Sequence, residues 1–255
     1  MKQILLVLAH PEPQSLNAHL AQAARAELEA QGHRVVVSDL YALGWQPVVG
    51  AADFPDRLNP AQLDIIAESG HAFKQGSLTA DVRAEQVKLL EADAVVFQFP
   101  LWWFGMPAIM KGWIERVYAY GLAYGYRDEG NRYRYGDGAL CGKRAMLSVT
   151  LGGPEADYSS RGINGQLDEL LFPITHGVLY YPGMNVLPTY AVYDAHRLDD
   201  AGVTRVADGL RARMRGLFDD APLPYRPQNG GDYPDRHALA ENVSPGVTGL
   251  RAHLR

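Results

Sequence analysis

Short apolar runs alternate with helical patterns along most of this chain, and this alternation is the feature that most restricts its fold. The first run, "ILLVLA" at residues 4–9, is continuously apolar, as expected of a central parallel strand covered on both faces. Further runs follow at residues 34–40, 94–99, 144–150 and 185–193. Strands that alternate with helices form a parallel sheet with right-handed crossovers, so the sequence predicts an α/β fold.

The segments between these runs carry helix start and stop signals, such as Ser15 before a periodic apolar stretch and Gly32 after it. Cap residues and apolar spacing predict helices over residues 15–32, 59–74, 79–90, 107–120, 166–174 and 200–217. Five strand candidates, rather than six or more, favour the flavodoxin-like form of the doubly wound fold. We therefore expect a five-stranded parallel sheet with helices on both faces and a ligand at the carboxyl ends of the strands.

A change in composition at Pro222 marks the end of the expected domain. The segment "PLPYRPQNGGDYP" places four Pro and two Gly within 13 residues, which excludes a regular helix or a central strand. The chain of 255 residues is 47% hydrophobic, which is enough for one α/β domain with a full core. We expect a catalytic domain over residues 1–221 and an extended C-terminal tail over residues 222–255, either partly disordered or packed on a partner subunit.

Charge and cysteine content exclude several classes of partner. The net charge is −5 and no basic run occurs, so nucleic acid is not an expected partner. The single Cys141 excludes an intrachain disulfide, and the apolar run after Met1 is too short for a signal peptide or a membrane span. No His, Cys or carboxylate spacing typical of a metal site occurs. These features predict a cytoplasmic protein without membrane insertion and without a metal.

Three loops that follow predicted strands carry the candidate site. The first, "AHPEPQSLN" at residues 9–17, leads into a helix, whose N-terminus attracts a phosphate. His10, Ser15 and Asn17 add side-chain donors there, although Ser15 also serves as an ordinary helix cap. No G-x-G-x-x-G follows the strand, so the usual dinucleotide motif is absent. The residues alone leave a phosphate site and a plain helix start both open.

The loop after the third strand is unusual because it is apolar. Its residues from Pro100 onward are Leu101, Trp102, Trp103 and Phe104, which gain nothing from exposure on an ordinary surface loop. They either fold back into the core or line a pocket for a flat ligand.

The loop after the fourth strand, "TLGGP" at residues 150–154, contains two glycines that let backbone N–H groups approach a ligand closely. If the three loops meet at one crevice, the ligand has a phosphate-bearing part and a flat ring. A flavin nucleotide fits that description, and core packing with an ordinary turn is the alternative. Because no nucleophile elbow or metal motif occurs, a redox role requires a bound cofactor.

Several long motifs together make the resemblance to one known family specific. They are "VLAHPEPQSLN", "SDLYALGWQPV", "FQFPLWWFGMPAIMKGWIERVY", "LAYGY", "SVTLGGPEADYSSRGINGQLDELLFPITHGVLYYPGMNVL" and "LFDDAPL", in family order up to about residue 225. On these motifs the chain resembles the NAD(P)H:quinone oxidoreductases, or DT-diaphorases, which are FAD enzymes of flavodoxin-like fold. The resemblance implies a homodimer with its active site at the interface. In such members NADH or NADPH reduces FAD by hydride, and FADH2 then reduces a quinone.

The resemblance also implies roles for individual residues. Those implied to hold the FAD pyrophosphate and adjoining groups are His10, Ser15, Leu16 and Asn17. The flavin-cradling loop is Pro100, Leu101, Trp102, Trp103 and Phe104. The residues implied at the pyrimidine edge of the flavin are Thr150, Leu151, Gly152, Gly153 and Tyr158, of which the last three and Asn164 are the catalytic candidates. The acceptor pocket is implied to contain Trp103, Phe104 and Asn164, with Tyr124, Tyr126 and Tyr181 from the partner subunit.

The sequence departs from the family pattern in three places. Asn164 stands where some members carry a histidine, and an amide cannot take up a proton to balance charge on reduced flavin. Trp102 replaces a smaller polar residue, which we expect to narrow the pocket. His176 matches one residue of a metal site in some relatives, but Tyr180 and Tyr225 occupy the other positions, so the resemblance implies no metal here.

Other functions stay open on the sequence alone. The same flavin can serve an azo or nitroaromatic reductase, or a redox-regulatory ancillary flavoprotein of an ion-efflux system that binds a membrane partner. A flavodoxin-like electron carrier is less consistent, because carriers are smaller and expose the flavin edge. The physiological acceptor and the preference between NADH and NADPH do not follow from the sequence.

Overall fold

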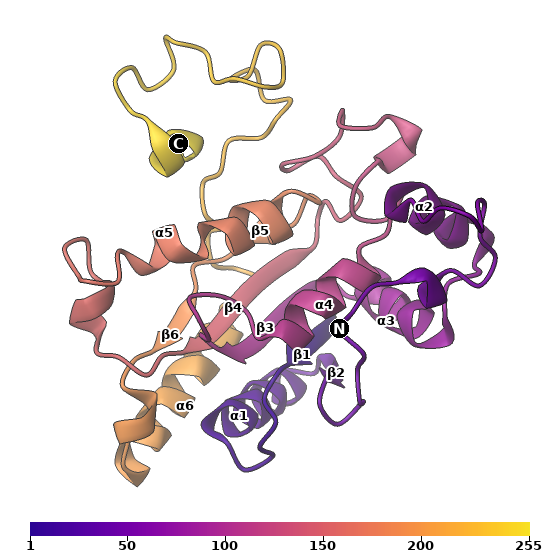
Figure 1. The fold of residues 1–255 in the computed structure, drawn as a ribbon. Coiled ribbons are helices and arrows are strands. Elements are labelled where there is room, and N and C mark those ends of the chain that lie inside the picture. Colours follow the sequence, from indigo (N-terminus) through magenta and orange to yellow (C-terminus); the bar gives the residue numbers. More distant parts are fainter.

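The computed structural model describes residues 1–255 and is built around one parallel sheet (Figure 1). Its strands are β1 (Gln3–Leu8), β2 (Arg34–Asp39), β3 (Ala94–Pro100), β4 (Arg144–Thr150), β5 (Asn185–Val186) and β6 (Tyr190–Val192). The strands lie in the order β2-β1-β3-β4-β5, and β6 also pairs with β4. This is the strand order of the flavodoxin-like doubly wound fold, so the predicted fold class is confirmed.

The fifth position of the sheet is shared by two short strands. A single strand over residues 185–193 is the sequence prediction, whereas the structure pairs β5 with the start of β4 and β6 with its end. Pro188 lies between them and has no N–H to donate to the ladder. The interruption therefore divides one strand into two, and the predicted sheet of five strand positions is retained.

Helices cover both faces of the sheet. They are α1 (Leu16–Ala30), α2 (Ile65–Gln75), α3 (Ala80–Glu91), α4 (Ala108–Val117), α5 (Leu167–Phe172) and α6 (Asp200–Arg215), and a π-helix at Pro173–Tyr180 continues α5. Short 3₁₀ turns occur at residues 51–53, 126–128, 155–158, 195–197 and 249–253. Figure 1 shows α1 and α6 on one face, with α3, α4 and α5 on the other.

The residues of β1 show why this strand is apolar from Ile4 to Leu8. Successive side chains of a strand point to opposite faces of a sheet. Leu5 and Val7 accordingly pack in the cluster that includes α3 and α4, whereas Ile4 and Leu6 pack with α1 and α6. Because both faces are covered, residues 4–8 of β1 are buried and need no polar alternation; only Gln3, at the start of the strand, is partly exposed.

The helix limits agree with the sequence at some caps and differ at others. Ser15 caps α1 as predicted, with its hydroxyl accepting the N–H of Ala18 at 3.2 Å. The second helix begins at Ile65 and not at Asn59, because the Asp64 carboxylate caps it. The side chain of Asn59 instead accepts from the N–H of Ala61 at 3.0 Å and forms a local turn.

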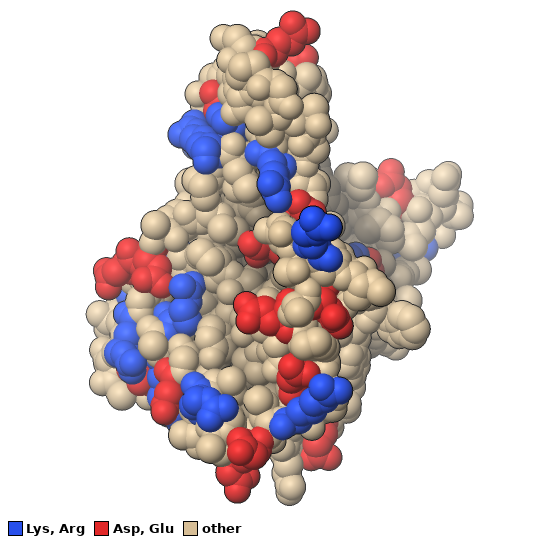
Figure 2. All heavy atoms as spheres, turned by 90° about the vertical axis from the view of Figure 1, so that its left-hand side faces the viewer, with Lys and Arg blue, Asp and Glu red and all other residues tan.

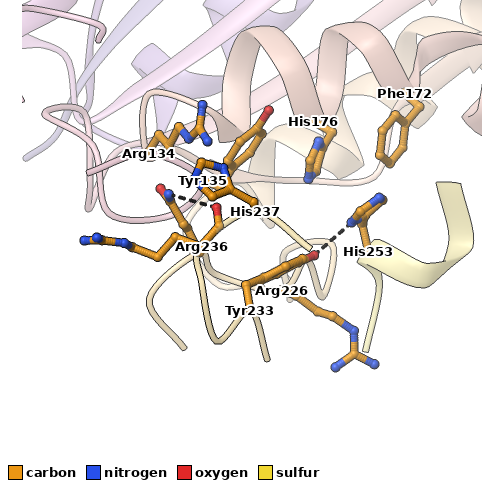
Figure 3. A pocket seen from close by; sticks show the side chains of 10 residues that line it. Arg134, Tyr135, Phe172, His176, Arg226, Tyr233, Arg236, His237 and His253 are labelled. Carbon is orange, nitrogen blue, oxygen red and sulfur yellow. Dashed lines mark hydrogen bonds between the residues drawn. The ribbon is translucent and has the colours of Figure 1, made fainter. Parts of the chain in front are cut away.

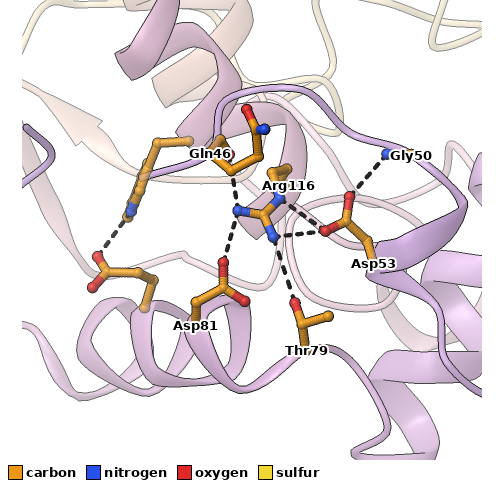
Figure 4. A network of polar contacts seen from close by, with 8 residues as sticks. Gln46, Gly50, Asp53, Thr79, Asp81 and Arg116 are labelled. Atoms are coloured by element: carbon orange, nitrogen blue, oxygen red, sulfur yellow. Dashed lines mark hydrogen bonds and ion pairs between the residues drawn. The ribbon is translucent and has the colours of Figure 1, made fainter. Parts of the chain in front are cut away.

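A buried ion-pair network holds α4 in place (Figure 4). The guanidinium of Arg116 donates to the Asp53 carboxylate at 2.6 Å and lies 2.8 Å from that of Asp81, on α3. A Cβ on Gly112 would lie 2.1 Å from the carbonyl oxygen of Pro47, so only glycine lets α4 approach this loop so closely. Removing one partner of such a buried pair strongly destabilises the folded state. The network therefore fixes the helix that directly follows the aromatic loop.

The C-terminal tail turns back on its own chain. It extends from the body as the yellow segment of Figure 1, and Tyr225 near its start pairs with Leu254 near its end. The backbone N–H of Gln228 donates to the backbone carbonyl of Tyr135 at 3.0 Å, which ties the tail to the segment before β4. Whether the tail also packs on a partner subunit, and whether a domain ends at residue 221, remain predictions.

The surface charge concerns the expected lack of a nucleic-acid partner, and the character of the helices concerns the expected lack of membrane insertion. Figure 2 shows Lys and Arg interspersed with Asp and Glu over one face of the molecule, with no gathering of either sign. No helix in the structure combines the length and the apolar character needed to cross a membrane.

Candidate functional site

The aromatic loop after β3 closes in a two-residue turn. Trp102 and Gly105 bond to each other in both directions, with N–H to carbonyl oxygen distances of 3.2 and 3.0 Å. The two central residues, Trp103 and Phe104, have φ angles of +50° and +60°. Glycine, asparagine and aspartate usually occupy such positions, because bulky side chains clash with the backbone there. Two aromatic residues in this conformation mark a strained turn of the kind found at ligand sites.

The turn presents its aromatic side chains to solvent. Trp103 is 97% exposed, Phe104 50% and Trp102 41%, so folding back into the core is wrong for these three residues. Pro100 is buried at the end of β3, and the N–H of Leu101 donates to the carbonyl of Thr150 at 2.8 Å. The loop thus leaves the sheet at Leu101 and then carries three rings that are partly or almost fully exposed.

Opposite this turn, the loop after β4 offers unused backbone donors. The N–H groups of Gly152 and Gly153 donate to no acceptor within the chain. In the β3–β4 ladder the rung after Leu101 and Thr150 would join the Gly152 N–H to the Leu101 carbonyl, and this rung is not formed. The pairing of β3 with β4 therefore ends before the aromatic turn and the glycine loop, and the N–H of Gly152 is left without an acceptor.

Tyr158 lies against this glycine loop. It ends the 3₁₀ turn at residues 155–158, and a Cβ on Gly153 would lie 3.3 Å from its ring and 3.6 Å from its hydroxyl oxygen. Its hydroxyl has no hydrogen-bond partner in the chain. The backbone N–H of Asn164 donates to the carbonyl of Asp157 at 2.9 Å, which brings Asn164 into the same loop. Two predicted residues, Tyr158 and Asn164, thus belong to the segment that lies beside the free amides.

The loop after β1 reaches the same edge of the sheet. The ring of His10 lies 6.1 Å from that of Trp102, which joins the first loop to the aromatic turn. Asn17 is buried: its side-chain nitrogen donates to Thr150 Oγ1 at 3.0 Å and its oxygen accepts from Gln98 at 2.8 Å. The bond between Asn17 and Thr150 therefore connects the start of α1 to the end of β4. Ser15 and Leu16, at the same helix start, are partly exposed to solvent.

The three remaining tyrosines of the predicted site lie elsewhere. Tyr124 and Tyr126 belong to the segment between α4 and β4, and Tyr181 follows the π-helix before β5. Both segments connect the end of a helix to the start of a parallel strand, so they lie at the amino edge of the sheet (Figure 1). Within one chain, the structure does not bring these tyrosines to the aromatic turn.

The amino edge also holds a compact aromatic cluster, shown in Figure 3. The His176 ring stacks between Tyr135 at 4.7 Å and Phe172 at 4.6 Å, and Tyr225 meets it edge-on at 5.0 Å. Burial, together with the nearby His253, lowers the pKa of His176 to about 4. The ring is therefore neutral near pH 7 and packs as an aromatic group.

A cavity of about 320 Å³ opens between this cluster and the tail. Among the lining hydroxyls, that of Tyr233 is already paired, with His253 Nδ1 at 2.8 Å. In the adjoining cluster, Tyr225 and Thr175 share a hydrogen bond of 2.8 Å. Tyr180 and Tyr225 lie beside His176, as the family resemblance implied, and no group of three potential metal ligands occurs in the chain.

The sequence reasoning missed the segment after β6. Asp194 and Ala195 both bond to the glycine loop, and His196 Nδ1 lies 3.8 Å from where a Cβ on Gly152 would stand. This segment could have been predicted, because ligands bind at the carboxyl ends of parallel strands, and this rule applies to the fifth strand as well as to the first, third and fourth.

Known proteins resemble this chain over nearly its whole length. The model of a family described as having a flavodoxin-like fold matches residues 2–214. A ribosyldihydronicotinamide dehydrogenase-like protein of Penicillium crustosum is 49% identical over 91% of this chain and 86% of its own length. The NAD(P)H dehydrogenase [quinone] 1 of Cavia porcellus is 38% identical over 90% of this chain and 82% of its own length. A crystal structure of a putative quinone reductase from Klebsiella pneumoniae covers 100% of both chains at 47% identity, with a TM-score of 0.96.

Proposed function

Because this chain belongs to the NAD(P)H:quinone oxidoreductase family of flavodoxin-like fold, we propose that it binds FAD and uses it to reduce quinones with NAD(P)H. The family membership makes it an oxidoreductase. The observation that carries the flavin assignment is the pair of exposed rings in a strained turn after β3, together with backbone amides without an acceptor in the loop after the neighbouring strand β4. A ligand with an extended aromatic ring system and hydrogen-bonding edges can stack on the exposed rings and accept hydrogen bonds from the free amides.

The residues at this edge of the sheet fit the parts of FAD. The amides of Gly152 and Gly153 and the Tyr158 hydroxyl are donors for the polar pyrimidine edge, and Trp103 and Phe104 supply apolar surface for the ring. The α1 N-terminus, with Ser15 and His10 near it, suits the pyrophosphate. We propose Pro100, Leu101 and Trp102 as the cradle of the ring, Asn17 and Thr150 as its floor, and Leu16 and Leu151 as flanking contacts.

A bound flavin supplies the hydride transfer, taking two electrons from NAD(P)H and passing them to the quinone in a second, ping-pong half-reaction. The protein then has to stabilise negative charge at the pyrimidine edge. Preorganised donors act on such charge without reorganising. Gly152, Gly153 and Tyr158 serve in that way, and Asn164 adds a neutral amide beside them.

We further propose that the working unit is a homodimer. The free rings and amides lie at one edge of the sheet, whereas Tyr124, Tyr126 and Tyr181 lie at the other, so one chain cannot bring them together. A two-fold axis that places the amino edge of one subunit on the carboxyl edge of its partner completes two equal sites. The tyrosines then close the acceptor pocket over the flavin.

The cofactor assignment is tested by releasing the ligand from purified protein by heat and separating it by chromatography. We expect FAD; finding FMN alone, or no flavin even after incubation with excess FAD, refutes the assignment.

The activity is tested by steady-state oxidation of NADH, NADPH and ribosyldihydronicotinamide with and without a quinone. Rapid quinone-dependent turnover with a nicotinamide dinucleotide is expected. An azo or nitro compound preferred over every quinone favours the alternative reductase, and poor turnover with all acceptors favours a regulatory flavoprotein. Neither alternative is supported by the relatives above.

A further inference from the structure

The segment after β6 bonds to the glycine loop from the side opposite to the aromatic turn. The N–H of Leu151 donates to the carbonyl of Val192 at 2.8 Å, and the N–H of Ala195 donates back to the carbonyl of Leu151 at 2.9 Å. The N–H of Asp194 donates to the carbonyl of Gly153 at 3.0 Å. Three main-chain bonds therefore fix the loop to residues 192–195.

These bonds determine where the free amide of Gly152 points. A peptide group is planar and trans, so its C=O and N–H point in opposite directions. The Leu151 carbonyl is directed toward Ala195, and the Gly152 N–H of the same peptide is therefore directed away from it. That direction leads to the β3 side, where the carbonyl of Thr150 accepts from Leu101. The Gly152 N–H thus points toward the aromatic turn.

We propose that Asp194 is a positioning residue, whose left-handed backbone returns the chain onto the glycine loop and thereby aims the Gly152 N–H at the flavin. The inference rests on the proposed flavin function. Asp194 has a φ of +49°, which lets its own N–H meet the carbonyl of Gly153 and the N–H of Ala195 meet that of Leu151. A residue that does not adopt a positive φ here moves the N–H groups of positions 194 and 195 away from the carbonyls of the glycine loop. The peptide group after Leu151 is then free to rotate.

The conformation, and not the charge, is what Asp194 supplies. Its carboxylate lies 3.5 Å from the guanidinium of Arg197, whose side chain is 71% exposed, and such ion pairs contribute little. Aspartate, asparagine and glycine adopt positive φ readily, whereas alanine does so with difficulty and a β-branched residue hardly at all. Substitutions at one position can therefore vary the backbone preference separately from the charge.

The test is a series at this position: Asp194→Asn, Asp194→Gly, Asp194→Ala and Asp194→Val. The dissociation constant of FAD is measured by quenching of flavin fluorescence, and the two-electron midpoint potential by equilibration with a reference dye. Ser244→Val is the matched control, because Ser244 is also left-handed, with a φ of +47°, but lies in the tail.

We expect Asn and Gly to keep the affinity within about twofold, and Ala and Val to weaken it by roughly 5-fold and 30-fold. The potential should fall with Ala and Val, because the N–H stabilises reduced flavin more than oxidised flavin; a tenfold difference between the two forms corresponds to ~30 mV. The Ser244→Val protein should match the parent in both measurements. If Asp194→Val does not fold, Asp194→Ala decides the question.

Equal affinity and potential in the Asn and Ala or Val proteins overturn the inference. A loss in Asp194→Asn as large as in Asp194→Ala also overturns it, because the carboxylate would then be the active feature. A parent protein that binds no flavin instead refutes the proposed function, so the two failures are distinguishable.

Discussion

The two edges of the sheet both carry aromatic residues, but they use them in opposite ways. At the amino edge, His176 stacks between Tyr135 and Phe172, and the hydroxyl of Tyr225 is paired with Thr175. At the carboxyl edge, Trp103 is 97% exposed and stands in a strained turn. The amino-edge rings pack against one another, whereas at the carboxyl edge Trp102 meets only the ring of His10, at 6.1 Å, and Trp103 and Phe104 meet no other aromatic ring of the chain.

This contrast indicates which of the two aromatic groups is suited to bind a ligand. A cluster whose rings and polar atoms are already matched stabilises the fold and gains little from a further molecule. Exposed rings on a strained backbone, beside unused amide donors, cost stability and persist where a ligand compensates them. Burial and hydrogen-bond accounting, rather than aromatic content, therefore separate structural from functional residues here.

The largest expected effect is on the amino-edge cluster. Tyr225→Ala removes a buried ring and should lower the free energy of unfolding by about 3–5 kcal/mol. Trp103→Ala, at the other edge, should change it by no more than about 0.5 kcal/mol, since its side chain packs on little. Urea unfolding of the flavin-free proteins at one concentration checks both. The contrast fails if Trp103→Ala destabilises as strongly as Tyr225→Ala.

Acid should weaken the same cluster. The pKa of His176 is about 4 in the folded protein, below the ordinary value of 6.5, because burial disfavours the charged ring. The unfolded chain thus binds a proton first, and stability falls as the pH drops from about 6.5 to about 4, by at most about 3 kcal/mol and less because the ring is partly exposed.

The matched variant for this effect is His176→Phe, which keeps a ring but removes the proton. Unfolding measured across that pH range should be less pH-dependent in the variant than in the parent. Parallel profiles for the two proteins would show that another group titrates.

At the carboxyl edge, Tyr158→Phe removes one donor and leaves the amides of Gly152 and Gly153. It should slow flavin reduction by roughly one to two orders of magnitude, less than the ~2.7–4 kcal/mol of a full donor loss. Asn164→Ala should cost less. Anaerobic stopped-flow reduction by NADH measures both rates. A Tyr158→Phe protein as fast as the parent assigns the tyrosine to packing alone.

The smallest expected effect tests the strain itself. Trp103→Asn should raise the free energy of unfolding of the flavin-free protein by about 0.5–1 kcal/mol, because asparagine tolerates a positive φ. The same change should weaken FAD binding, since a ring is lost from the pocket. Thermal unfolding and flavin titration give the two numbers. A variant less stable than the parent contradicts the claim of strain.

The fold was predictable because it rests on local patterns. The apolar run of β1 and the cap at Ser15 both predict their elements, since burial and capping act over a few residues. The start of the second helix was missed because Asn59 and Asp64 are both good caps, and only the contacts of the folded chain select Asp64.

The site was predictable only in part. The aromatic turn and the glycine loop could be found in the sequence because each follows an expected strand. Asp194 could not, because its proposed role depends on its backbone angle and on the bonds from its own N–H to Gly153 and from the next N–H to Leu151, more than 40 positions away. The separation of Tyr124 from the turn likewise requires the topology of the folded sheet.

The central claim is that the active site joins the carboxyl edge of one subunit to the amino edge of another. It is tested most directly by combining two inactive proteins, Trp103→Ala/Phe104→Ala and Tyr124→Ala/Tyr126→Ala, in mixed dimers formed by coexpression. Each mixed dimer then holds one site with both edges intact, so quinone reductase activity should return to about a quarter of the parent value at random pairing. No recovery in a preparation shown to contain mixed dimers would contradict the account, because every chain would then depend on both of its own edges.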